Sequence, residues 1–158
     1  MVVTNPLVPS WLDENKDLNA LDSKIWPASA ARNERGELEL AGLSAPELVR
    51  QYGSPLHVID QEDFEARLER VHGAFEKAAQ NAGTSVKLYY ASKALLTTEI
   101  ARWVVNAGYA IDVSTGGELA VALASGSGGD RLGVHGNNKS LVEIGRAVSA
   151  DVSAIVID

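Results

Sequence analysis

The stretch KLYYASKALLTTEI, residues 87–100, decides how this chain folds. Up to Ser92 it is rich in apolar and aromatic residues, which is typical of a buried strand. After Lys93 the apolar residues recur at steps of three and four, which is typical of one face of a helix. A lysine therefore stands where a predicted strand gives way to a predicted helix. It is either a solvated strand end, the commoner case, or a reactive amine held in place.

Strands and helices alternate from this point to residue 158. The pattern predicts strands at 86–92, 109–113, 131–136 and 152–158, and helices at 94–106, 117–125 and 140–148. Each strand and its helix take roughly 20 residues, and apolar strands that are covered by helices form parallel sheets. The predicted fold class is therefore α/β, either an open doubly wound sheet or a (β/α)8 barrel.

Polar residues close the predicted strands: Lys93, Asp112, His135 and Asp158. Because side chains alternate in a strand, the first three can share one face with small residues, while the opposite face is apolar in all three strands. This pattern favours a barrel, whose strand ends build the active site, although an open sheet predicts something similar. Asp112 could instead cap the helix that follows it. A complete barrel takes about 250 residues, so we expect residues 61–158 to form its first half.

The first 60 residues have a different character. We interpret residues 1–60 as an N-terminal arm and a segment of a β-domain, with isolated aromatic residues Trp11 and Trp26 in the irregular arm. The patterns that follow the arm predict strand 36–42, helix 44–53 with Ser44 as its N-cap, strand 55–60 and, beyond the domain boundary, helix 61–80.

Composition excludes several classes of function. The chain has 158 residues, 46% hydrophobic and 22% charged, and its net charge of -7 argues against a nucleic-acid or anionic-membrane partner. It has no cysteine, so disulfides and thiolate chemistry are excluded, and a reducing compartment such as the cytoplasm is favoured. We find no signal peptide and no membrane span in the pattern. The three histidines lack metal-ligand spacing, so no metal is expected.

Two glycine-rich loops are candidates for phosphate sites. STGG (114–117) precedes a helix and could present backbone N–H groups to an anion, but such turns usually serve close packing only. GSGGDRLG (126–133) lacks the spacing of a dinucleotide site and precedes a strand, so we reject that reading. By default, HGNNKS (135–140) is a loop that ends in an N-cap serine.

Four longer stretches closely resemble the N-terminal part of diaminopimelate decarboxylases, which are decarboxylases with an alanine racemase-like barrel that depend on pyridoxal 5′-phosphate. They are YGSPLHVID (52–60), VKLYYASKALLTTEIARWV (86–104), GYAIDVSTGGELAVALASG (108–126) and VHGNNKS (134–140). The resemblance covers residues 20–158. It implies removal of CO₂ from meso-2,6-diaminopimelate to give L-lysine, by a cytoplasmic homodimer that acts on this small molecule.

The resemblance also implies roles for individual residues. Lys93 matches the lysine that holds pyridoxal 5′-phosphate as an imine, and is the expected catalytic residue. Asp112 and His135 match positions around the barrel mouth and are expected to bind the cofactor; Glu118 matches a position there as well. In the family, the phosphate loop and the substrate-binding arginines come after the position of Asp158. We therefore expect the chain to be a fragment that is inactive alone.

Two other functions stay open at this point. One is a non-catalytic truncated product that only binds or oligomerises. The other is a pyridoxal-phosphate decarboxylase that acts on a different basic amino acid, because the residues that choose the substrate cannot be read from this part of the sequence.

Overall fold

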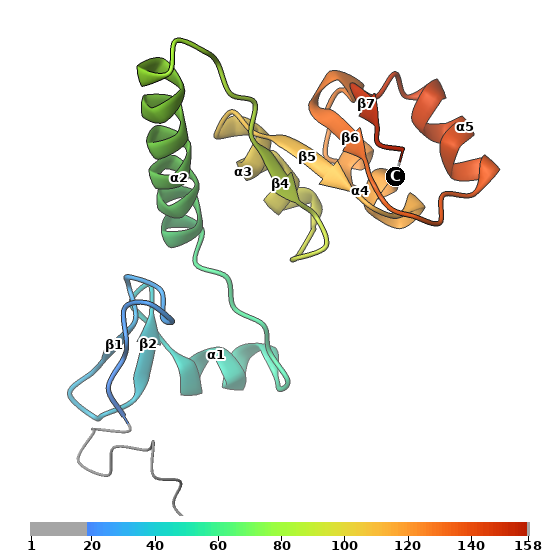
Figure 1. Cartoon of the computed structure of the whole chain (residues 1–158). Helices are drawn as coiled ribbons and strands as arrows, with labels where there is room; N and C mark the ends of the chain where they lie inside the picture. Colours follow the sequence, from blue (N-terminus) through green and yellow to red (C-terminus); the bar gives the residue numbers. More distant parts are fainter. Residues whose placement is uncertain (1–18, 158) are drawn as a thin grey trace, which may run out of the picture. The chain divides into compact units, whose positions relative to one another are not determined.

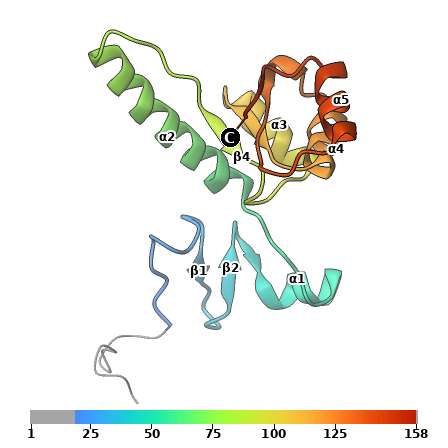
Figure 2. The same ribbon diagram turned by 45° about the vertical axis from the view of Figure 1, so that its right-hand side comes forward.

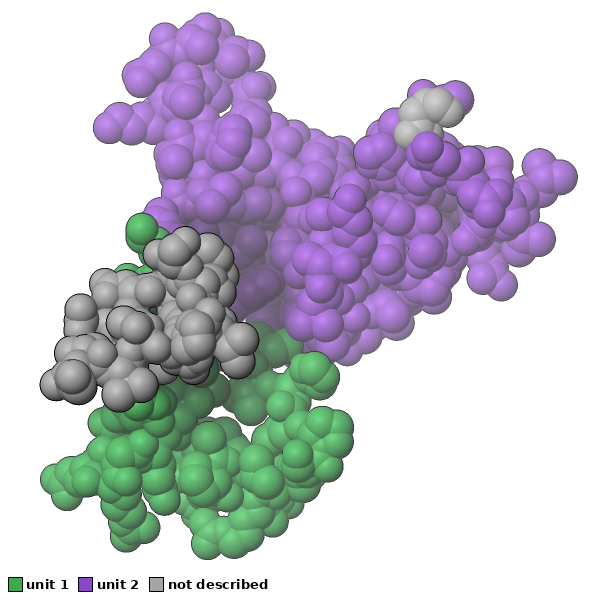
Figure 3. All heavy atoms as spheres, turned by 60° about the horizontal axis from the view of Figure 1, so that its bottom comes forward, with its two compact units in different colours: residues 1–60 green, residues 61–158 purple. Residues whose placement is uncertain are grey.

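The computed structural model describes residues 19–157, in a chain that divides into two compact units (Figure 3). Unit 1 comprises residues 1–60 and unit 2 residues 61–158. The expectations for Trp11 and Asp158 fall outside the described residues. Each unit is described by itself.

Unit 1 contains a small antiparallel sheet followed by one helix (Figure 1). Its elements are β1 (Ala31–Arg32), β2 (Leu38–Leu40), β3 (Leu43–Ser44) and α1 (Ala45–Tyr52), and the strands pair in the order β1-β2-β3. The Asn33 side chain closes the turn between β1 and β2, because its oxygen accepts hydrogen bonds from the backbone N–H groups of Arg35 and Glu37 at 3.0 and 2.9 Å.

Two predictions for unit 1 are corrected by the structure. Ser44 precedes α1 as predicted, but its side chain makes no capping hydrogen bond and donates instead to the Glu37 carboxylate at 3.3 Å. Residues 55–60, predicted as a strand, have no regular secondary structure. A strand is held by hydrogen bonds to a neighbouring strand, and none of the described strands pairs with this segment.

Unit 2 is a four-stranded parallel sheet with helices (Figures 1 and 2). In chain order its elements are α2 (Gln61–Asn81), β4 (Tyr89–Ala91), α3 (Thr98–Asn106), β5 (Ala110–Val113), α4 (Gly116–Ala124), a 3-10 turn (Gly129–Arg131), β6 (Leu132–Val134), α5 (Leu141–Ser149) and β7 (Ala154–Ile155). The strand order is β4-β5-β6-β7. A doubly wound sheet reverses its strand order at a switch point, whereas consecutive order is that of a barrel. The predicted parallel α/β fold is confirmed.

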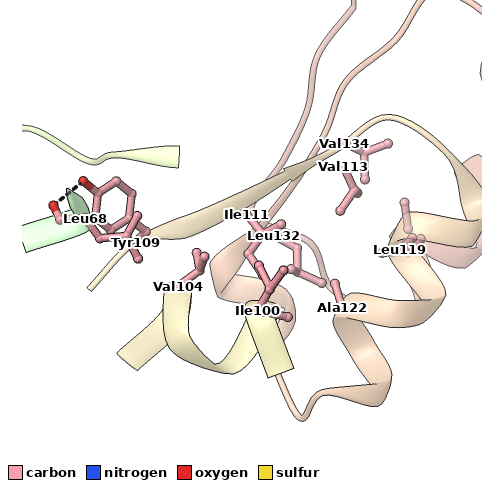
Figure 4. Packing of buried hydrophobic residues seen from close by; sticks show 12 residues of the cluster. Leu68, Ile100, Val104, Tyr109, Ile111, Val113, Leu119, Ala122, Leu132 and Val134 are labelled. Carbon is pink, nitrogen blue, oxygen red and sulfur yellow. Dashed lines mark hydrogen bonds between the residues drawn. The ribbon is translucent and has the colours of Figure 1, made fainter. Parts of the chain in front are cut away.

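The helices pack on one face of this sheet (Figure 4). Alternate strand residues form the core with them, namely Ile111, Val113, Leu132 and Val134, all buried. Their partners are buried residues of α3 and α4, such as Ile100, Val104, Leu119 and Ala122. The prediction of which strand residues face the helices is confirmed. The intervening residues, including Asp112 and Gly133, are left for the opposite face.

Helix α2 is joined to the same core. The buried hydroxyl of Tyr109, just before β5, donates a hydrogen bond of 2.8 Å to the Leu68 carbonyl of α2 (Figure 4). The Phe64 ring meets Tyr90 and Trp103 with ring centres 5.9 and 6.0 Å apart. Phe64 and Leu68 are apolar residues one helical turn apart, so these contacts bury one face of the predicted helix.

The structure differs from the prediction mainly in where individual strands and helices begin and end. Strand β4 is only three residues long, so Lys93 lies in the turn after it and not at the strand end. The helix that follows begins at Thr98, because Thr97 caps it by accepting a hydrogen bond from the Ile100 N–H at 3.2 Å. Helix α5 begins as predicted after Ser140, which forms a full capping box with Glu143.

Candidate functional site

Residues 19–157 contain neither a membrane-spanning helix nor a cluster of metal-binding side chains. No helix in this range has the length and apolar character that a membrane crossing requires. Nor do three or more His, Asp or Glu side chains of the same range gather where they could hold a metal ion. The polar groups described next lie at the carboxyl ends of the parallel strands.

Strand register brings distant residues to one edge of the sheet. Ala91 of β4 pairs with Asp112 of β5, and Asp112 pairs with Gly133 of β6, two residues before His135. The carboxyl ends of β4, β5 and β6 therefore lie side by side. In such sheets, ligands bind at this edge.

Asp112 and His135 are in contact. The distance from His135 Nδ1 to Asp112 Oδ2 is 3.3 Å, and the side chains are 47% and 26% exposed, respectively. Asp112 does not cap α4, because the cap residue of that helix is Thr115. A proton on Nδ1 that is donated to Asp112 leaves Nε2 as the imidazole's acceptor.

Lys93 has an exposed side chain on a firmly held backbone. Ser92 N–H donates to the Asp112 carbonyl at 3.0 Å, and Ala94 N–H donates to the Ala91 carbonyl at 3.1 Å. The Tyr90 hydroxyl donates to the Leu95 carbonyl at 2.8 Å, and burial raises the pKa of this phenol, which keeps it protonated as a donor. Within the described range, Lys93 itself makes no hydrogen bond or ion pair. Its side chain is exposed.

A second set of contacts, which the sequence pattern did not predict, holds the residue before Lys93. The Glu118 carboxylate oxygen Oε2 accepts a 2.8 Å hydrogen bond from Ser92 Oγ and a 2.6 Å hydrogen bond from the Ser114 N–H. Ser92 is 2% exposed. Thr115 and Glu118 have the spacing of a capping box, but the glutamate reaches past its own cap residue. That spacing alone could not reveal Ser92 as the partner.

The N-terminus of α4 is occupied by groups of the chain itself. The backbone N–H groups of Ser114, Gly116 and Glu118 donate to Glu118 Oε2, Glu143 Oε1 and Thr115 Oγ1, respectively. A Cβ at Gly116 would lie 3.1 Å from Cγ of Glu143, so the glycine permits this approach. The STGG loop therefore serves close packing, and the anion-binding alternative for it has no support in these contacts.

Glu143 yields a prediction about pH. Hydrogen bonds from the Ser140 backbone and hydroxyl and from Gly116 N–H hold the pKa of Glu143 below its ordinary value of 4.5. Since the folded pKa is lowered, the stabilisation is fully present above the ordinary value and is lost as pH falls through the lowered pKa. We expect wild type to be more stable than Glu143→Gln at neutral pH, with a difference that shrinks in acid. Urea unfolding of both proteins across this pH range measures it; a constant difference would contradict the assignment.

The same sheet face carries the aromatic ring of Tyr89 beside Gly133 of β6. A Cβ at Gly133 would lie 3.1 Å from Cε1 of Tyr89, so β6 carries a glycine where this ring crosses it. The Tyr89 hydroxyl lies 3.3 Å from Ser153 Oγ, a contact that lowers the pKa of Tyr89, as does Lys87 to a smaller extent. Tyr89 begins β4, and Oδ1 of Asp112 lies 4.0 Å from the same Cβ position, so the ring and this carboxylate share one side of the sheet.

Comparison with known proteins agrees with this geometry. Residues 60–158 match the family described as "Pyridoxal-dependent decarboxylase, pyridoxal binding domain". The diaminopimelate decarboxylase of Mycobacterium leprae is 42% identical over 95% of the chain, and that of Bacillus subtilis is 35% identical over 82%. The chain spans 30% and 29% of the length of these two relatives.

Solved structures are similar as well. The diaminopimelate decarboxylase of M. jannaschii, solved in complex with L-lysine, matches 84% of the chain with a TM-score of 0.76 and 28% identity. A lysine/ornithine decarboxylase of Vibrio vulnificus, complexed with putrescine, matches 72% with a TM-score of 0.58 and 25% identity. The chain covers 30% and 29% of these two structures. The fold described above is therefore part of a decarboxylase barrel.

Proposed function

The chain belongs to the family of pyridoxal-dependent decarboxylases, and we propose that it is part of a diaminopimelate decarboxylase, the enzyme that converts meso-2,6-diaminopimelate to L-lysine and CO₂. The observation that carries the proposal is the exposed Lys93 side chain in the turn that follows β4, whose carboxyl end pairs with that of β5. Hydrogen bonds hold Ser92, Ala94 and Leu95 around it, whereas the Lys93 amine has no hydrogen-bond partner among residues 19–157. A lysine that forms a bond with a carbonyl group needs such a setting.

The residues present fit one end of pyridoxal 5′-phosphate. Lys93 offers the amine that its aldehyde requires, and the paired Asp112 and His135 side chains offer hydrogen-bonding groups at the neighbouring strand ends. The start of α4 offers no comparable site for the phosphate, because the N–H groups of Gly116 and Glu118, and that of Ser114 in the loop before the helix, already donate within the chain. We expect Lys93, Asp112 and His135 to contact the cofactor and other residues to bind the phosphate.

Each residue has a task in this proposal. When bound, pyridoxal 5′-phosphate accepts the electron pair that CO₂ leaves behind. Lys93 anchors the cofactor. Asp112 fixes the orientation of the His135 ring through its 3.3 Å contact with Nδ1.

Substrate choice is the part that an experiment must decide. Relatives named for diaminopimelate resemble the chain more closely, with a TM-score of 0.76 against 0.58 for the lysine/ornithine enzyme. We therefore expect the full-length enzyme to prefer meso-diaminopimelate over L-lysine and L-ornithine by about 10⁴-fold in kcat/KM, since a site that pairs a polar substrate group rejects analogues without it.

The measurement is CO₂ release from each of the three amino acids with added cofactor. Equal or faster release from L-ornithine or L-lysine would favour a decarboxylase of another basic amino acid. No release from any of them would favour a protein that only binds or oligomerises. The proposal includes the homodimer and the cytoplasmic location that the sequence resemblance implies.

A further inference from the structure

Glu118 links two loops at the carboxyl ends of the strands. Its carboxylate lies in the first turn of α4, and both of its hydrogen bonds run to residues outside that helix. Ser92 belongs to the turn after β4, and Ser114 to the loop after β5. One oxygen, Oε2, therefore joins the ends of two neighbouring strands.

The point of attachment is one residue away from Lys93. The backbone of Ser92 is held by Asp112 at 3.0 Å, and its side chain is held by Glu118 at 2.8 Å. Ser92 is thus anchored to β5 and to α4 at the same time, and it is almost wholly buried. These two anchors restrict the position of the Lys93 Cα, because Lys93 directly follows Ser92 in the chain.

Helix capping does not account for this arrangement. Glu143 occupies the same third position of α5 and bonds back to its own cap residue, Ser140, at 2.9 and 2.8 Å. Glu118 bypasses its cap residue, Thr115, which itself accepts a hydrogen bond from Glu118 N–H at 3.1 Å. The first turn of α4 is therefore capped by a hydroxyl, while the carboxylate is used across the sheet edge.

We propose that Glu118 is a positioning residue for Lys93: it acts through Ser92 to hold the Lys93 amine where the cofactor aldehyde must meet it. The inference rests on the proposed function of Lys93. It predicts that Glu118 controls how fast and how completely the cofactor becomes attached, separately from any effect on folding. Misplacing a reacting group by about 1 Å can cost on the order of 100-fold in rate.

Four variants of the full-length enzyme separate positioning from stability. Glu118→Ala removes both hydrogen bonds, whereas Glu118→Gln keeps an oxygen that can accept both. Glu143→Ala is the matched control, because it removes a carboxylate from the same helix position without touching Ser92. Ser92→Ala removes only the contact next to Lys93 and provides the same test if Glu118→Ala does not fold.

The measurement is the rate at which apo-protein binds added pyridoxal 5′-phosphate covalently, followed by absorbance and fixed by borohydride reduction at the Lys93 peptide. We expect Glu118→Ala and Ser92→Ala to slow attachment by about tenfold or more, and Glu118→Gln to stay within about threefold of wild type. Glu143→Ala should attach at the wild-type rate. Kinetics should show a lower kcat with little change in KM.

Two negative results can be told apart. If wild type attaches no cofactor at Lys93, the proposed function fails. If wild type attaches it but Glu118→Ala and Ser92→Ala do so at the same rate, or if Glu143→Ala is slowed as much as they are, the positioning role of Glu118 is wrong and the function of Lys93 stands.

Discussion

Lys93→Ala is expected to abolish covalent attachment of pyridoxal 5′-phosphate and to reduce decarboxylation by about 10³-fold or more in the full-length enzyme. The reason is chemical, because a methyl side chain cannot form a bond with the cofactor aldehyde. The fold should be unaffected, since the Lys93 side chain is exposed and makes no hydrogen bond within residues 19–157. Borohydride reduction followed by peptide mass measurement locates the attached cofactor.

Nearby lysines provide the controls. Lys87 Nζ donates to the Asp130 carbonyl at 3.1 Å and lies 5.2 Å from the centre of the Tyr89 ring, and Lys139 Nζ donates to the Gly136 carbonyl. Both amines therefore have structural roles. Lys87→Ala should retain cofactor attachment, whereas Lys93→Arg should lose it although the positive charge is kept. Cofactor mass on the Lys87 or Lys139 peptide would overturn the assignment.

Gly129→Ala is expected to destabilise the protein by about 3 kcal/mol or more, at the upper end of overpacking effects. Gly129 begins the 3-10 turn before β6, and a Cβ there would lie 2.0 Å from the Ala150 carbonyl oxygen and 2.4 Å from that of Asp151. Both obstacles are backbone atoms at the end of α5, so no side-chain rotation relieves the clash. The Gly129 carbonyl also accepts the Ser153 N–H at 2.9 Å, which ties the two loops together.

The control for this prediction is a glycine with open space. Gly145 lies inside α5, and no atom comes within 4 Å of a Cβ built on it. Gly145→Ala should therefore stabilise the helix by up to about 1 kcal/mol. Urea unfolding of both variants measures the two effects, and a Gly129→Ala protein as stable as wild type would refute the close approach of these loops.

The alternation of strands and helices, and the side of each strand that faces the helices, follow from the sequence alone. Ile111 and Val113 in β5 and Leu132 and Val134 in β6 are apolar at every second position, and all four are buried against helices. Such periods arise because a strand turns its side chains to alternate faces and a helix repeats every 3.6 residues. The cap of α5 is equally local, since Ser140 and Glu143 are three residues apart.

The contacts of the candidate site depended on the tertiary structure. Asp112 meets His135, and Glu118 meets Ser92, across 23 and 26 residues of sequence, and both contacts require the register that pairs β4 with β5 and β5 with β6. Residues 55–60 carry a strand pattern but form none of the described strands, because a strand exists only with a hydrogen-bonded neighbour. Residue patterns record the preferences of neighbouring residues in the chain, whereas register and strand pairing are set by the packing of the whole sheet.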